Sequence, residues 1–211
     1  MIYIKLILVA IMWGGTFIAT KMVSHVFGSF TGASYRYLVA LIFMVPILLV
    51  KDPKAFKVTR KQLFQLSLLG ATGIFAYSFF FFTGLRMVKA SHGALIVALN
   101  PVLVMLISSS IGKERISGIK IIGLILSIAG TAIVIARGDL LELFTMFTWG
   151  DAFMLGCPIS WALYTYFAKD ALKFATPLQA STWAIVIGLA MILFFVPFET
   201  YPVKVDWTIW L

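Results

Sequence analysis

The chain of 211 residues is 62% hydrophobic and 12% charged, with a mean hydropathy of +1.04. Since an ordinary soluble domain is about half apolar and about a quarter charged, this composition excludes a soluble globular fold. The formal net charge of +9 would suggest nucleic-acid binding in a soluble protein, but here the basic residues lie between long apolar runs, so no nucleic-acid partner is expected.

Helices of membrane-spanning length dominate the predicted structure. A helix needs roughly 20 mostly apolar residues to cross about 30 Å of hydrocarbon. The sequence predicts spans, in chain order, at Ile4 to Thr20, Phe30 to Val50, Leu63 to Leu85, Gly93 to Ile111, Ser117 to Ala136, Ala152 to Ala168 and Leu178 to Phe198, with another beginning at Trp207. Because no alternating pattern repeats, the expected fold class is an all-α integral membrane protein, a polytopic helix bundle of about 7–8 spans.

The basic residues predict how the chain is oriented. When the N-terminus is placed in the cytoplasm, most Lys and Arg residues fall in inner connections, above all in the segment from Lys51 to Lys61. The apolar stretch after Lys5 continues through Ile18 without a convincing cleavage site, so it is expected to be retained. We predict a multi-pass protein of the plasma or inner membrane, in contact with the lipid bilayer, with a cytoplasmic N-terminus.

An internal repeat divides the predicted chain. A shift of 148 positions places Trp13 on Trp161, Lys21 on Lys169 and Tyr35 on Trp183. The two units begin five spans apart, and this odd number makes the second enter from the opposite side. We therefore expect inverted repeats, a common construction of secondary carriers. The expected domains are a five-span repeat at 1–137, an outer linker at 138–149 and the start of a second repeat, incomplete, at 150–211.

Three stretches resemble the EamA-type branch of the drug/metabolite transporter superfamily. They are W-G-G-T-F, S-Y-R-Y-L-V-A-L, and A-S-H-G-A-L-I-V-A-L-N-P-V-L-V-M-L followed by G-K-E-R-I-S and G-L-I-L-S-I-A-G. The resemblance implies a ten-span carrier with two five-span halves, a central cavity and cytoplasmic termini. It also implies export of amino acids, related metabolites or other small organic molecules. This chain ends within the second half of that pattern.

Two tryptophans at mid-depth are the main candidates for contact with a small-molecule substrate. Tryptophan is usually found at membrane interfaces, whereas Trp13 and Trp161 lie near the middle of their spans. Helical spacing extends their faces to Thr16 and Phe17, and to Tyr164 and Thr165. We predict that both faces line a cavity, although the same aromatic residues would also serve to pack helices.

Further candidates lie in spans two, three and four. Tyr77 extends the aromatic set, with packing as its alternative role. Asn100 precedes Pro101, which frees the Val97 carbonyl; the pair could bind a polar group of a substrate at mid-depth, or the proline kink could serve helix packing alone. Arg36 lies about 9 Å into its span; it could neutralise a substrate carboxylate, or snorkel to the outer headgroups at lower cost.

His92 could titrate near neutral pH and couple transport to protons, or it could be a surface histidine of a first helical turn.

One cysteine and two histidines cannot build a closed zinc site, and no cofactor is expected. Without clustered reactive groups or a G-x-S-x-G turn, a membrane-embedded enzyme is disfavoured. The alternative to a carrier is that the chain is a truncated remnant or a membrane partner protein that does not transport. Five small residues are predicted to pack helices: Gly70, Gly73, Gly123, Ser127 and Gly130.

Overall fold

The computed structural model of the chain describes residues 2–110, 117–136 and 148–199, and these residues are all-α. The helices of the first part are α1 (Ile2–Val26), α2 (Ser29–Lys51), α3 (Arg60–Leu69), the π-helix η1 (Gly70–Ala76), α4 (Tyr77–Met87), α5 (Ala90–Val97), α6 (Asn100–Ser110) and α7 (Gly118–Ala136). Those that follow are α9 (Trp149–Ala171), α10 (Pro177–Phe195) and the short 3-10 helix η2 (Val196–Phe198). The described residues contain no strand.

Five segments of these helices are long and apolar enough to cross a membrane: Tyr3–Ser24, Ser29–Lys51, Arg60–Met87, Ala90–Ser110 and Pro177–Phe198. The predicted all-α, polytopic membrane fold is therefore confirmed. α7 contributes the shorter apolar stretch Gly118–Gly130. α9 has 23 residues, which is enough to cross, but it carries more polar sequence than the other five. The span predicted from Trp207 and most of the linker predicted at 138–149 lie outside the described residues.

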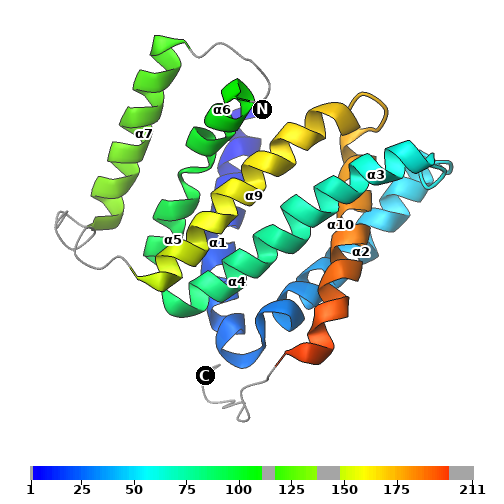
Figure 1. The fold of residues 1–211 in the computed structure, drawn as a ribbon, viewed down its shortest axis with the longest axis horizontal. Coiled ribbons are helices and arrows are strands. Elements are labelled where there is room, and N and C mark those ends of the chain that lie inside the picture. The colour runs from blue at the N-terminus through cyan, green and yellow to red at the C-terminus, as the bar shows by residue number, and fades with distance from the viewer. Residues whose placement is uncertain (1, 111–116, 137–147, 200–211) are drawn as a thin grey trace.

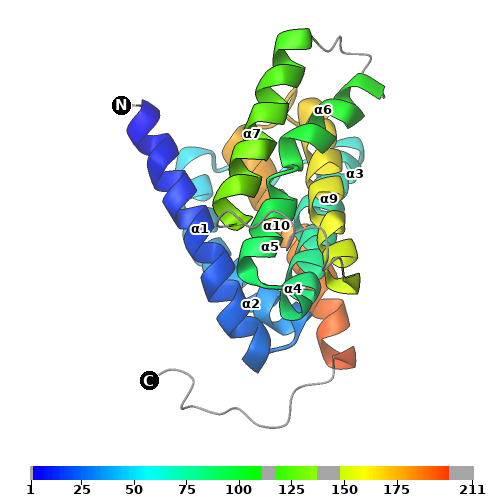
Figure 2. The ribbon, with the colours of Figure 1, turned by 90° about the vertical axis from the view of Figure 1, so that its left-hand side faces the viewer.

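The helices of the later segment are packed among those of the earlier one. Figure 1 shows α9 lying alongside α4, and α9 also contacts α3, η1, α5 and α6. α10 lies against α2, α3 and η1. Figure 2 shows α1 and α7 at the periphery, where most of their side chains are exposed. Because α9 is covered by other helices, a less apolar sequence is tolerated there.

A π-helical turn joins the two halves of span three. α3 begins with a capping box, in which Thr59 accepts a hydrogen bond from Gln62 N while the Gln62 side chain accepts one from Thr59 N. The helix then continues through η1 into α4 without a gap. Short π-helical segments occur mostly as local bulges within α-helices, often at functional sites. This bulge was not predicted from the sequence.

Span four is interrupted where proline was expected to disturb it. α5 ends at Val97 and α6 begins at Asn100, so the two residues between them are not helical. Pro101 has no N–H to donate to the Val97 carbonyl, and its ring clashes with that carbonyl. In α9, by contrast, the helix continues past Pro158.

Glycines allow η1 to approach α10 backbone to backbone. A Cβ on Gly70 would lie 2.9 Å from both the Ala184 oxygen and the Gly188 nitrogen. A Cβ on Gly73 would collide with the Tyr164 ring. The packing role predicted for Gly70 and Gly73 is therefore confirmed.

Within the described residues, the same prediction is not confirmed for α7. Around Gly123 and Gly130, a Cβ would meet no atom within 4 Å. α7 contacts the described bundle chiefly through α5, which leaves these glycines on an exposed face. Small residues at helical spacing permit close packing but do not by themselves supply a neighbouring helix.

Substituting Gly188 with valine is expected to destabilise the bundle, because the new Cβ would lie 2.4 Å from Ile74 Cβ and 2.9 Å from the Gly70 carbonyl. Overpacking of this kind typically costs about 1–3 kcal/mol. Cys157 is the single cysteine of the chain and is buried, so its reaction with a fluorescent maleimide during heating measures unfolding. Gly123→Val is the matched control; an equal loss of thermal stability in both variants would contradict the assigned contact.

Candidate functional site

A cavity of about 170 Å³ lies where α1, α2, η1, α4 and α9 meet. Most of its wall is formed by aromatic rings. Three of the lining side chains carry a hydroxyl group, and one, Arg36, is a cation. The lining residues are Trp13, Thr16, Phe17, Arg36, Tyr37, Gly73, Ile74, Tyr77, Phe81 and Trp161. The cavity therefore draws its walls from both segments of the chain.

The two predicted tryptophans meet at this cavity. The rings of Trp13 and Trp161 are 5.6 Å apart, with an edge-to-face geometry of 83°. Trp161 also lies 5.8 Å from the Tyr77 ring and 5.2 Å from the Tyr164 ring. Aromatic pairs of this geometry contribute about 0.5–1.5 kcal/mol beyond their buried area. Trp13 remains 44% exposed, because α1 lies at the edge of the bundle.

Arg36 carries a positive charge on the cavity wall. It lies seven positions after Ser29, the first residue of α2, which corresponds to about 10 Å along the helix. Its guanidinium carbon lies 5.3 Å from the centre of the Tyr37 ring, a cation–π contact. Within the described residues Arg36 forms no ion pair. The hydroxyl of Tyr37 is held by Ser78, at 2.9 Å.

Six of the nine predicted substrate-contacting residues line the cavity: Trp13, Thr16, Phe17, Arg36, Tyr77 and Trp161. Two of the others, Tyr164 and Thr165, are not among its lining residues. Tyr164 instead fills the space beside Gly73 and supports Trp161. The hydroxyls of Thr16 and Thr165 both donate to the carbonyl four residues earlier in their own helices.

Asn100 also lies outside the cavity lining. Its side chain is 92% buried, and its Oδ1 atom has no hydrogen-bond partner within the described residues. The polar position at the helix break is thus present as predicted, but it is separate from the aromatic cavity.

Four lining residues were not predicted: Tyr37, Gly73, Ile74 and Phe81. Phe81 lies four residues after Tyr77, and helical spacing would have indicated it. Gly73 and Ile74 belong to the π-helix η1, which was not expected from the sequence.

Glu199 connects the later segment to the start of α2. Its two carboxylate oxygens accept hydrogen bonds from Phe30 N at 2.8 Å and Thr31 N at 2.9 Å. The N-cap residue of α2 is Gly28, which has no side chain to satisfy these N–H groups. Glu199 therefore caps α2 from a distant part of the chain, where a negative charge also interacts favourably with the helix dipole.

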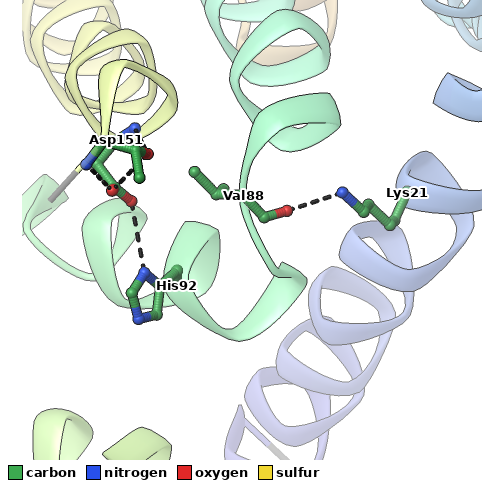
Figure 3. Close-up of polar contacts among 5 residues, drawn as sticks. Lys21, Val88, His92 and Asp151 are labelled. Atoms are coloured by element: carbon green, nitrogen blue, oxygen red, sulfur yellow. Dashed lines mark hydrogen bonds and ion pairs between the residues drawn. The ribbon is translucent and has the colours of Figure 1, made fainter. Parts of the chain in front are cut away.

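Lys21 makes a complementary contact with the end of α4. Its ammonium donates to the carbonyls of Leu85 at 2.6 Å and Val88 at 2.8 Å. Figure 3 shows the contact with Val88. A cation is favourable here because the last carbonyls of a helix lack partners within that helix.

His92 lies at the same end of the bundle, where α5 meets α9. Its Nδ1 atom is 3.5 Å from Asp151 Oδ1. Figure 3 shows the His92 ring facing the Asp151 carboxylate. The other carboxylate oxygen of Asp151 accepts hydrogen bonds from the backbone and side chain of Thr148. The His92 side chain is 22% exposed and Asp151 is buried, so protonated His92 would form an ion pair between the two segments.

Comparison with known proteins gives one family and several relatives. A family model described as the EamA-like transporter family matches residues 1–136. "Uncharacterized transporter YyaM" of Bacillus subtilis is 29% identical over 206 residues, which cover 97% of this chain and 68% of that protein. "Uncharacterized inner membrane transporter YhbE" of Escherichia coli K12 is 31% identical over 169 residues, 78% of this chain and 52% of that protein. An "uncharacterized transporter" of Archaeoglobus fulgidus is 26% identical, covering 92% of this chain and 67% of its own length. No solved structure matches the chain.

Replacing Glu199 with glutamine is expected to lower stability by about 1–2 kcal/mol, because the start of α2 loses charge-assisted hydrogen bonds. Thermal unfolding followed by Cys157 labelling measures the loss. Asp170→Asn is the matched control, since Asp170 is exposed and pairs only locally with Lys173. If the two variants unfold at the same temperature, Glu199 does not hold the segments together.

Proposed function

Because the chain belongs to the EamA-like transporter family, we propose that it carries small organic molecules across the membrane and binds them in the cavity around Trp13 and Trp161. The observation that supports this assignment is the composition of the cavity wall. Residues from both ends of the chain form it, and Arg36 supplies a positive charge within a candidate span. An intramembrane ionisable residue at a cavity is typical of a substrate or ion pathway.

The proposed substrates are amino acids or related metabolites. The ring faces of the two tryptophans offer flat apolar area to an organic group, and the Arg36 guanidinium offers paired donors to a carboxylate. Polar groups in such cavities fix orientation, whereas the aromatic walls supply most of the contact area.

The proposed mechanism is alternating access between two inverted halves. Carriers of this construction rock one half against the other around a site near the bilayer midplane. The contacts of Glu199 with α2 and of His92 with Asp151 join the two segments at one end of the bundle. Rocking would open this end by breaking them.

The proposed direction is export, from a plasma or inner membrane in which the N-terminus lies in the cytoplasm. The excess of basic residues in the predicted inner connections supports that orientation. The printed name of the Escherichia coli relative places that protein in the inner membrane.

Cells that express the chain are expected to grow at higher concentrations of toxic amino-acid analogues than cells without it. Trp161→Phe should lower that resistance several-fold, because it removes part of the ring area at the cavity. Trp149→Phe is the matched control on the same helix, since Trp149 is 84% exposed.

The growth screen also separates the carrier from a membrane partner that does not transport. A partner would give no resistance to any analogue, although it would still insert in the membrane. Equal resistance from the wild type and from Trp161→Phe, across every analogue exported, would remove Trp161 from the binding site.

Arg36→Lys is expected to reduce transport of carboxylate-bearing substrates at least about tenfold while membrane insertion stays normal. Lysine keeps the charge and can snorkel, but it lacks the planar pair of donors. The control is Arg60→Lys, which makes the same change at an exposed residue at the start of α3. Uptake by inverted vesicles measures the effect, and unchanged uptake by Arg36→Lys would assign Arg36 to snorkelling.

A further inference from the structure

A second hollow of about 580 Å³ adjoins the aromatic cavity, between α1 and α2. Its walls include Ala19 and Val23 of α1, Val39 of α2 and Phe82 of α4. Thr16 and Arg36 line both spaces, so the two meet at these residues. We call the second space the α1–α2 crevice.

The two spaces differ in size and chemistry. At about 170 Å³, the aromatic cavity is smaller than the range of about 300–1,000 Å³ usual for ligand pockets, whereas the crevice falls within that range. The crevice is walled mainly by apolar side chains, and Arg36 is the one charged residue among those that line it. A ligand that used both spaces would place an anionic group at their junction.

The crevice is also accessible from the side of the bundle. Val39 is 55% exposed and lies on its rim. Within the described residues, this apolar flank of α1 and α2 is exposed at the surface of the bundle. A hydrocarbon chain can therefore enter the crevice from the bilayer without crossing a polar layer.

From this geometry we infer that the site takes amphiphilic carboxylates: the carboxylate binds Arg36, a compact organic group occupies the aromatic cavity and a hydrocarbon tail lies in the α1–α2 crevice. The inference rests on the proposed carrier function and names its substrate class. Charge complementarity supports the inference that a carboxylate binds at Arg36. This residue has no acidic partner within the described residues, and its guanidinium lies over the Tyr37 ring where the two spaces join. A free amphiphile is the proposed occupant, in preference to a resident phospholipid.

N-acyl-tryptophan with a diazirine near the end of a ten-carbon acyl chain tests this inference. The full chain is placed in nanodiscs of phosphatidylcholine, illuminated with the probe, digested and analysed by mass spectrometry. The label is expected on the α1 and α2 residues that line the crevice, and excess unlabelled N-decanoyl-tryptophan should displace it. Labelling that is not displaced, or that is as strong on exposed α7, would show simple partitioning into lipid and overturn the inference.

Two pairs of variants locate the carboxylate and the tail. Arg36→Gln should lower crevice labelling at least about tenfold, whereas Lys51→Gln, at the other end of α2, should leave it unchanged. Ala19→Phe should fill the crevice and lower the labelling similarly, whereas Ala10→Phe on the same helix should not. Thermal labelling of Cys157 confirms that each variant is folded. Equal labelling in Arg36→Gln and wild type would overturn the inference.

Equilibrium binding of N-acetyl-tryptophan, which has the head group without the tail, separates this inference from the proposed function. If it binds in an Arg36-dependent manner while the acyl probe leaves the crevice unlabelled, the small-molecule site stands and the amphiphile inference fails. Displacement of the probe by N-acetyl-tryptophan supports one joined site. Displacement by phosphatidylglycerol, with none by N-acetyl-tryptophan, would make the crevice a lipid site and overturn the inference.

Discussion

The position of the cavity depends on the close contact of η1 with α9 and α10. Gly70 and Gly188 carry no side chains, so the backbones of η1 and α10 can meet. Gly73 leaves the space that the Tyr164 ring fills, and Tyr164 in turn supports Trp161, 5.2 Å away. A side chain at Gly73 would therefore displace the second tryptophan of the cavity. The geometry of the proposed site therefore depends on the packing of span three.

Sequence reasoning succeeded where a single physical requirement dominates. Apolar length determines which segments form spanning helices, and the predicted spans agree with the described helices to within a few residues at most ends. The mid-span positions of Trp13 and Trp161 indicated a shared cavity, and both residues line one cavity with their rings 5.6 Å apart. The break at Asn100 followed from the missing N–H of Pro101.

The remaining features depend on contacts between distant residues, which hydropathy and spacing do not record. Gly73 and Ile74 of the π-helix η1 line the cavity, and nothing in the apolar pattern of span three distinguishes η1 from a regular helix. Glu199 looked like an ordinary residue of a connection, yet it caps a helix about 170 residues earlier in the chain. The glycines of α7 follow the same spacing rule as those of η1, but no described helix covers them.

Arg36 differs from the charged residues that make contacts at one end of the described bundle, and the contrast bears on function. At one end, Lys21 meets the carbonyls that end α4, Glu199 meets the N–H groups that begin α2, and Asp151 is bonded to Thr148 and faces His92. Arg36 lies about 10 Å inside its span and has only an aromatic ring beneath it. A charge at such depth is costly, and packing alone would be served by an apolar residue. The Arg36 guanidinium lies where two cavities join and has no acidic partner within the described residues, and the proposed binding of an anion depends on this group.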